Sequence, residues 1–173
     1  PIEPASAACI MVDHPSNLYS AGRDIIVTHN TYTAAMLVAW FGSVHPPDET
    51  RIVTTAPKMR QVKMLLWPHI HRVHQFAQLP GELDQVQWKM PGVPLPMAYG
   101  FSASDYDEDA VQGIHERHLL IVVDEAGGIS HTLGRALESI TTGAHTRILA
   151  IGNPPTDDEG SWFEERTESP LWN

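Results

Sequence analysis

Two adjacent carboxylates, Asp124 and Glu125, follow an apolar run in the stretch LLIVVDEAGGIS, residues 119–130. In open α/β sheets ligands bind beyond the carboxyl ends of the strands, so acids that directly follow a buried strand are delivered into a site. In nucleotide-hydrolysing folds the first such acid holds the Mg²⁺ that bridges the phosphates, and a neighbouring acid polarises the attacking water. The pattern indicates phosphoryl chemistry, although a strand that simply leaves the core into a polar turn has the same pattern.

Two further polar positions follow other predicted strands. Asn153, in ILAIGNPP, lies just past an apolar run, and one strand-helix-strand unit separates it from Asp124. A carboxamide there is able to hydrogen-bond a phosphate or the attacking water and to report hydrolysis to the next segment, whereas the alternative is an ordinary Asn-Pro turn. Thr54 and Thr55 close the run RIVTTAP beside a basic stretch. We assign Asn153 and Thr55 to coupling.

The elements that would position these residues alternate along the chain. Short apolar or β-branched runs predict strands within residues 24–28, 51–57, 119–126 and 146–155. Helices are expected at residues 31–42, from Lys58 onward with an interruption or restart at Pro68, and around HTLGRALESI. Continuous apolar runs are typical of strands covered on both faces. The predicted fold class is therefore α/β, with a mainly parallel central sheet and helices on both faces.

The middle and the end of the chain read differently. Residues 85–104 alternate apolar and polar residues and contain three prolines, which predicts a hairpin or edge pair on the main sheet. From Pro154 onward the sequence is polar, acidic and rich in turns, which indicates a tail or the start of a linker. We therefore assign residues 1–153 to one domain, whose N-terminal part need not be complete, and residues 154–173 to the tail.

Composition narrows the class of protein. A chain of 173 residues that is 42% hydrophobic suits one well-packed domain. The single cysteine, Cys9, cannot form an internal disulfide, which fits a cytosolic protein. Eleven Lys and Arg against 21 Asp and Glu give a net charge of -10, so any contact with DNA must be local. Because no window approaches the length of an apolar membrane span, we expect a soluble protein without membrane contact.

The connection before residue 31 lacks the motif that usually accompanies such acids. Nucleotide-hydrolysing α/β domains place a phosphate loop, GxxxxGK[ST], between a strand and the following helix. Here only His29 and Asn30 stand between Thr28 and Thr31, with neither glycine nor lysine. Two residues cannot form a cradle of backbone N–H groups, and no lysine is present to carry charge to the phosphates.

Four segments, in their order and spacing, nevertheless resemble the ATPase domain of the large terminase subunit, the DNA-packaging motor of tailed bacteriophages. They are TYTAAMLVAWF, RIVTTAPKMRQV, FSASDYDEDAVQGIHERHLLIVVDEAGGI and RILAIGNPP, and the resemblance runs from about Arg23 to Asn153. It implies a P-loop NTPase fold of the ASCE or RecA-like type.

The resemblance implies a role for each matching residue. Thr31 matches the last residue of the Walker A motif, whose hydroxyl ligates Mg²⁺, and Asn30 stands beside it as a nucleotide-binding candidate. Asp124 matches the Walker B acid, a ligand of the same Mg²⁺, and Glu125 matches the catalytic glutamate. Asn153 matches the coupling motif that follows Walker B. The departure from the family's pattern is the phosphate loop, whose Gly-Lys segment would fall between Asn30 and Thr31.

The function implied by the resemblance is that of a motor that hydrolyses ATP and moves double-stranded DNA into a procapsid. The implied cofactors are ATP and Mg²⁺. The implied partners are double-stranded DNA, the portal of the procapsid, the small terminase subunit and further copies in a ring, in the cytoplasm of an infected bacterium. Lys58, Arg60 and Lys63 are candidates for contact with DNA phosphates, although a solvated helix face has the same pattern. Arg60 and Arg135 are candidates by position for the arginine that stabilises the transition state.

Two other functions remain open. A helicase-like ATPase core is one, because DEA after one strand and TTAP after another occur there too, but a helicase would need a second similar domain. A non-catalytic scaffold with a degraded nucleotide site is the other, and a genuine loss of the phosphate loop would favour it. Binding of nucleotide with Mg²⁺ separates the scaffold from the two enzymes. Stimulation by procapsid rather than by single-stranded DNA separates the packaging motor from the helicase.

Overall fold

The structure of the chain, a computed structural model, describes residues 19–21, 26–28, 30–105, 114, 116–141, 145–153, 161–167 and 169. The strands are β1 Tyr19–Ala21, β2 Ile26–Thr28, β3 Thr50–Ala56, β4 Glu82–Asp84, β5 Gln87–Lys89, β6 Ala98–Ser102, β7 His118–Val123 and β8 Thr146–Ala150. The helices are α1 Asn30–Val44, α2 Met59–Gln61, the π-helical η1 Val62–Leu66, α3 Trp67–Phe76, the short 3₁₀ turns η2 Ala103–Asp105 and η3 Ala126–Gly128, α5 His131–Ser139 and α6 Trp162–Thr167.

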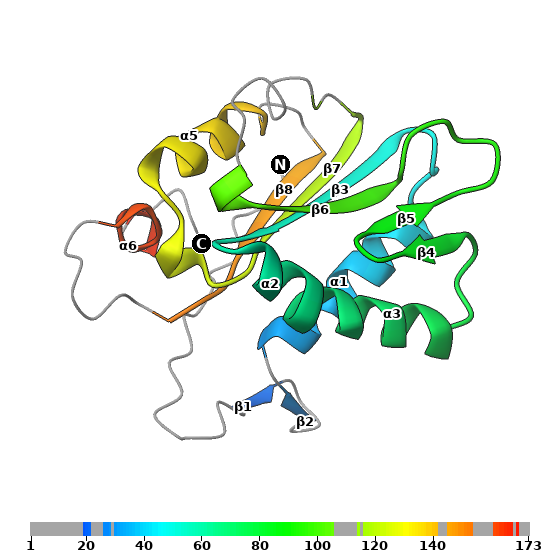
Figure 1. Cartoon of the computed structure of the whole chain (residues 1–173), viewed down its shortest axis with the longest axis horizontal. Helices are drawn as coiled ribbons and strands as arrows, with labels where there is room; N and C mark the ends of the chain where they lie inside the picture. The colour runs from blue at the N-terminus through cyan, green and yellow to red at the C-terminus, as the bar shows by residue number, and fades with distance from the viewer. Residues whose placement is uncertain are drawn as a thin grey trace, which may run out of the picture.

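A six-stranded sheet in the order β4-β5-β6-β3-β7-β8 forms the centre of the fold (Figure 1). β3 runs parallel to both β6 and β7, and β7 runs parallel to β8, whereas β4 and β5 are antiparallel additions at one edge. The register pairs Thr55 with Val123 and Val123 with Ala150, so β3, β7 and β8 end side by side. The predicted mainly parallel sheet is confirmed.

Two hydrophobic cores lie on opposite faces of this sheet, with α1 and α3 over one face and α5 and α6 over the other (Figure 1). Alternate residues of β7 enter the two cores: Leu120 and Val122 face α1, whereas Ile121 and Val123 face α5. Because both faces are covered, the strand needs apolar residues at every position, which explains its unbroken apolar run. Helices on both faces were predicted and are confirmed.

The predicted first strand is present but lies elsewhere. Ile26–Thr28 pairs antiparallel with β1 in a separate two-stranded sheet and does not join the six-stranded sheet. One physical reason is the length of its connection, since only His29 stands between Thr28 and the start of α1 at Asn30. A strand usually needs about two to six residues to turn into a helix that packs on its own sheet.

The helix after β3 continues past Pro68. α2, η1 and α3 follow one another without a gap, and Pro68 is the second residue of α3. The irregularity predicted at Pro68 lies just upstream, in the π-helical turn of η1. Such turns are rare and frequently occur at functional sites.

The hairpin predicted within residues 85–104 is present. β5 and β6 pair antiparallel, and the three prolines of this region fall in the connection between them. β4 adds an edge strand that was not predicted. β6 itself is an interior strand, because it also pairs in parallel with β3.

Part of the predicted polar tail packs on the core. Trp162, the first residue of α6, is fully buried against α5, and its indole N–H donates to a carboxylate oxygen of Glu138 at 3.1 Å. Arg166 of α6 forms an ion pair with the same carboxylate. Residues 154–160 lie outside the described residues, so the domain boundary after Asn153 stays a prediction. None of the helices in the described ranges has the length and apolar character needed to span a bilayer.

Candidate active site

The first turn of α1 lies over the end of β7, where the two adjacent carboxylates begin. The packing of α1 sets this position, because Ala34, Ala35 and Val38 are fully buried in the same core as Val122 of β7. Small side chains on this face let the helix approach the sheet closely. The carboxyl edge of the sheet and the amino end of a helix therefore meet at Asp124, as open α/β sheets favour for ligand sites.

Thr31 and Asp124 are brought together from positions far apart in the sequence. The Thr31 hydroxyl lies 3.5 Å from Asp124 Oδ1, toward which it donates. This separation is long for an O–H···O hydrogen bond, whose usual range is roughly 2.5–3.0 Å. It is short enough for two ligands of one Mg²⁺, because oxygens bound at about 2.0–2.1 Å can be at most about 4.2 Å apart. Hydroxyl and carboxylate oxygens are also the donors that Mg²⁺ prefers.

The Asp124 carboxylate forms no ion pair with a positively charged side chain among the described residues. Its side chain is 2% exposed. Burial is the main cause that raises its pKa from 3.8 to about 6, and the charge of Glu125 raises it further. Hydrogen bonds from the Glu125 backbone N–H, at 3.1 Å, and from Thr31 act in the opposite direction. A cation beside Asp124 would stabilise the charged form and lower this pKa, so the electrostatics favour a bound metal ion.

Glu125 adopts a backbone conformation that is rare outside glycine. Its φ is 53° and its ψ is 46°, in the left-handed region. The neighbouring backbone holds this turn: the Ala126 N–H donates to the Ile151 carbonyl at 2.8 Å, and the Gly128 N–H donates to the Glu125 carbonyl at 3.0 Å. Strain of this kind costs of order 1 kcal/mol or more and is concentrated at functional sites. The half-buried side chain of Glu125 thus leaves the strand end in a defined direction.

Thr55 and Asn153 flank Asp124 on the two neighbouring strands. The Thr55 carbonyl accepts the Asp124 N–H at 2.9 Å, and the fully buried Thr55 hydroxyl has no hydrogen-bond partner among the described residues. Asn153 is exposed and comes two residues after Ile151, whose carbonyl binds the Ala126 N–H. The structure therefore places both at the same edge as Asp124 and Glu125. Their coupling role stays a prediction.

Asn30 begins α1 and covers its amino end. Its side-chain oxygen accepts the N–H of Thr31 at 2.8 Å and lies 3.4 Å from the Thr31 hydroxyl. The start of a helix attracts anions such as phosphate. However, no glycine-rich loop and no lysine stand between β2 and α1. Thr31 and Asp124 therefore fit the metal-binding part of a nucleotide site, whereas among the described residues the first turn of α1 is the candidate for contact with the phosphates.

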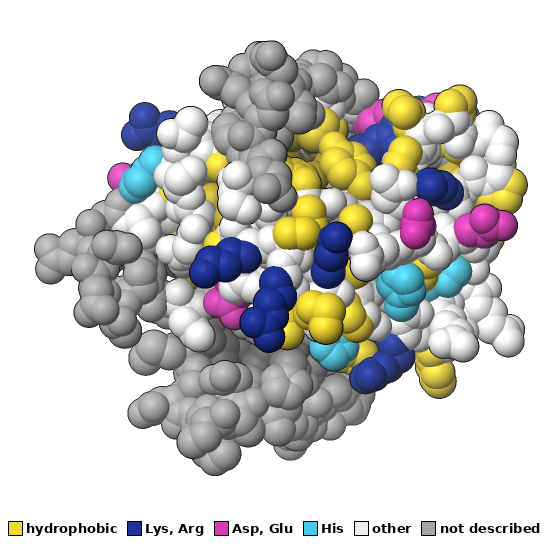
Figure 2. Space-filling view, in the orientation of Figure 1, with side chains coloured by type: hydrophobic (Ala, Val, Ile, Leu, Met, Phe, Trp, Pro, Cys, Tyr) yellow, Lys and Arg dark blue, Asp and Glu magenta, His cyan; other side chains and the backbone are white. Residues whose placement is uncertain are grey.

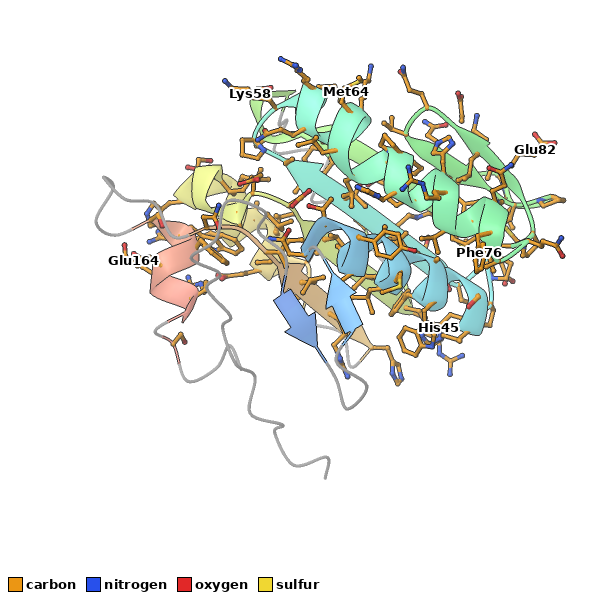
Figure 3. All side chains as sticks on the ribbon, turned by 90° about the horizontal axis from the view of Figure 1, so that it is seen from below. His45, Lys58, Met64, Phe76, Glu82 and Glu164 are labelled. Carbon is orange, nitrogen blue, oxygen red and sulfur yellow. The ribbon has the colours of Figure 1, made fainter. Side chains whose placement is uncertain are left out.

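The basic candidates lie on the helix that follows β3. Lys58 and Arg60 are exposed and Lys63 is partly exposed. Figure 2 shows Lys and Arg side chains gathered over α2 beside hydrophobic ones, and in Figure 3 Lys58 and Met64 project outward from this segment. Arg135 is exposed on α5, on the other face of the sheet. Their roles in binding DNA or in catalysis are untested.

One residue at this edge had no role in the sequence analysis. Gly152 follows β8 and lies against the backbone of Glu125 and Ala126. The signal in the sequence is a glycine directly after the apolar run ILAI and next to Asn153. A glycine at such a place marks a close approach of two backbones.

No protein-family model matches the chain, and a search of curated proteins finds no match. Solved structures do match. The ATPase domain of the Thermus phage P74-26 large terminase superposes with a TM-score of 0.58 at 18% sequence identity, over 79% of this chain and 58% of that one. The large terminase of a thermophilic bacteriophage gives a TM-score of 0.56 at 12% identity, over 72% of this chain and 30% of that one. The complex of this second terminase with ADP gives 0.51 at 12% identity.

The matched part of the chain thus spans 58% of the P74-26 domain and 30% of the second terminase. At these identities the likeness concerns the fold. The six-stranded sheet, with its parallel strands β6, β3, β7 and β8 and its helices on both faces, has the fold of large terminase ATPase domains, as the resemblance in the sequence implied.

Proposed function

We propose that the chain is the nucleotide-hydrolysing domain of a terminase-type motor. The observation that carries the proposal is the meeting of Thr31 with Asp124 at the end of β7, next to a glutamate held in a left-handed turn. The terminase ATPase fold supports it, and so does the ADP complex of the thermophilic bacteriophage terminase, whose fold this chain shares. Thr31 and Asp124 would hold Mg²⁺, and the nucleotide would be ATP.

In this proposal each residue acts through its position. The Thr31 hydroxyl and the Asp124 carboxylate bind and orient the ion, which when bound neutralises charge on the phosphates. Glu125 orients the attacking water and accepts its proton. Asn30 contacts the phosphates at the start of α1. Asn153 and Thr55 pass the change at the site to the neighbouring strands, and Arg60 or Arg135 stabilises the transition state.

The motor function is the wider part of the proposal. Lys58, Arg60 and Lys63 would contact the phosphates of double-stranded DNA, a contact that is independent of sequence and weakened by salt. Hydrolysis in several copies arranged in a ring would move DNA into a procapsid through its portal, together with a small terminase subunit, in the cytoplasm of an infected bacterium. The basic segment follows β3 and the acids follow β7, and these two strands are neighbours in the sheet.

A second candidate is a non-catalytic domain that binds a partner without turnover. The observation in its favour is the single residue, His29, between β2 and α1, which leaves no room for a phosphate loop. The two candidates differ in one measurable property, because only the enzyme needs Glu125.

The test measures binding of a fluorescent ATP analogue and release of phosphate, with and without Mg²⁺. We expect the unaltered chain to bind nucleotide in a Mg²⁺-dependent way and to hydrolyse it. Glu125→Gln should bind equally well but hydrolyse at least about a hundredfold more slowly, the usual contribution of a general base. Asp124→Asn should lose the Mg²⁺ dependence. Glu82→Gln, which neutralises an exposed acid at the far edge of the sheet, is the control and should match the unaltered chain.

Two results would count against the enzyme. If no nucleotide binds at any Mg²⁺ concentration, the non-catalytic candidate is favoured. If Glu125→Gln hydrolyses as fast as Glu82→Gln, the role of Glu125 is wrong.

The DNA contact has a separate test. Replacing Lys58 or Arg60 by Ala should weaken binding of duplex DNA alike for unrelated sequences and reduce the slope of log K against log salt by about 1 for each lost phosphate contact. Lys89→Ala is the matched control, because Lys89 is an exposed lysine on β5 with only a long ion pair to Asp84 at 3.8 Å. Equal losses in all three variants would mean that the basic segment has no special role.

A further inference from the structure

The segment that follows β8 touches the backbone of the turn at Glu125 and Ala126, which follows β7. A Cβ atom placed on Gly152 would lie 2.7 Å from the Ala126 nitrogen, 3.2 Å from the Glu125 carbonyl carbon and 3.3 Å from the Glu125 Cα. Real Cβ atoms essentially never come within 3.0 Å of such neighbours. All three atoms belong to the backbone, so no side-chain rotation could relieve the contact. The two segments would have to move apart by several tenths of an ångström.

Space, rather than backbone conformation, makes glycine necessary here. Among the described glycines only Gly81 and Gly92 have positive φ values. At Gly42, Gly128 and Gly134 the nearest atoms that an added Cβ would meet belong to side chains and not to the backbone. Gly152 is therefore the described glycine that excludes a side chain because it lies against the backbone of the candidate site.

The close approach bears directly on Glu125. The left-handed turn at Glu125 is fixed on one side by the hydrogen bond from the Ala126 N–H to the Ile151 carbonyl, at 2.8 Å. Ile151 immediately precedes Gly152. A side chain at position 152 would push the β8 end away from Ala126 and lengthen this hydrogen bond. Glu125 would then be free to leave its strained conformation.

We propose that Gly152 is a positioning residue that fixes the direction of the Glu125 carboxylate by letting the end of β8 lock the turn after β7. This inference rests on the proposed function for its catalytic consequence, because Glu125 there orients the attacking water. The contact also joins Asn153, the next residue, to the same turn. A displacement at Asn153 would thus reach Glu125 through one backbone contact.

Amide hydrogen exchange tests the contact without any nucleotide. In Gly152→Ala the Ala126 amide should exchange at least about tenfold faster, relative to the slowest amides of β7, than in the unaltered chain. The control is Gly92→Ala, which strains a residue with φ +77 in open space far from the site and should leave the relative rate unchanged. An unchanged Ala126 rate in Gly152→Ala overturns the inference.

Measuring kcat and nucleotide affinity separately tests the expected effect of Gly152 on catalysis. Gly152→Ala should lower kcat about tenfold or more and keep the affinity for Mg²⁺-nucleotide within about twofold, because Thr31 and Asp124 do not move, and small misplacements of reacting groups are costly. If the unaltered chain hydrolyses ATP and Gly152→Ala hydrolyses it equally fast, the inference fails while the proposed function stands. If the unaltered chain does not hydrolyse ATP but Ala126 exchange responds as expected, the contact is supported and the proposed function fails.

A measurement on the unaltered chain covers the case in which Gly152→Ala does not fold. The Ala126 amide should then exchange as slowly as the Asp124 amide, which donates to the Thr55 carbonyl at 2.9 Å inside the sheet. Exchange of Ala126 more than about tenfold faster than that of Asp124 would show that the two segments are not locked, and it would overturn the inference.

Discussion

The Asp124→Asn substitution should change how the stability of the chain depends on pH. Asp124 is 2% exposed, and burial first, then the charge of Glu125, raises its pKa from 3.8 to about 6. The folded state therefore holds the proton more tightly than the unfolded chain. Below about pH 3 the carboxyl is largely protonated in both states. As the pH rises further the unfolded chain loses the proton first, so the free energy of unfolding falls, mostly between about pH 4 and pH 6, and the loss is complete by about pH 7.

The expected size follows from the shift. A pKa difference of about two units corresponds to about 3 kcal/mol, since one unit is worth about 1.4 kcal/mol. Asn has no charge at any pH, so Asp124→Asn does not suffer this loss. Measured against the unaltered chain, the free energy of unfolding of the variant should rise by about 2–3 kcal/mol between pH 4 and pH 7. The comparison removes the effect of titrating groups that do not interact with Asp124.

Urea unfolding followed by tryptophan fluorescence provides the assay, because Trp67, Trp88 and Trp162 are fully buried and report loss of both cores. The titration runs from about pH 4 to about pH 8, the range that contains the expected change, in buffers free of divalent cations. Glu82→Gln, which removes an exposed carboxylate at the far edge of the sheet, is again the control. A flat difference for Asp124→Asn would refute the argument that the buried carboxylate is uncompensated in the folded state.

Two further predictions concern the packing behind the site. Thr54→Val should lower the free energy of unfolding by about 1–3 kcal/mol, because the Thr54 hydroxyl accepts a hydrogen bond from the buried indole N–H of Trp67 at 2.9 Å. Thr55→Val should leave the free energy of unfolding unchanged or raise it, because the buried Thr55 hydroxyl has no hydrogen-bond partner in the described part of the chain. Urea unfolding of the two neighbouring variants checks this, and an equal loss in both would contradict it. Gly134→Ala should lower the melting temperature, because the added Cβ would lie 2.3 Å from the ring of Trp162 and overpacking of a core costs about 1–3 kcal/mol. This cost should exceed the gain of about 1 kcal/mol that alanine brings to a helix relative to glycine. An unchanged or higher melting temperature would mean that α6 does not pack on α5 as described.

The parts of the fold that could be predicted from the sequence are those whose pattern lies within a single strand or helix. The unbroken apolar run of β7 follows from its burial on both faces, and the two acids after it are where a parallel strand delivers them. The same reasoning placed β3, β8 and α1. Once the strands are parallel and adjacent, the meeting of Asp124 with the end of β8 follows from the topology.

The parts that could not be predicted depend on contacts between elements. β2 has the composition of a strand of the main sheet, but it pairs with β1 and is joined to α1 by a single residue. The sequence of a three-residue strand does not specify which strand it pairs with. The role of Gly152 is similar, because its requirement for space becomes visible only when the backbone of Ala126 is placed 2.7 Å from the missing Cβ. The left-handed turn at Glu125 is likewise stabilised by a hydrogen bond to the segment that follows the neighbouring strand β8, and the residues DEAGG by themselves do not predict it.

The hydrophobic core positions Thr31 and Asp124, the two residues proposed to bind Mg²⁺. Thr31 is held near Asp124 by the burial of Ala34 and Ala35 of α1 against the sheet. Asp124 in turn is fixed by its N–H bond to the Thr55 carbonyl within the sheet. The pair that would bind Mg²⁺ is therefore determined by the core. In the proposed function the rate of hydrolysis would depend on how well the start of α1 holds the phosphates, so metal affinity and turnover should respond to different substitutions in this chain.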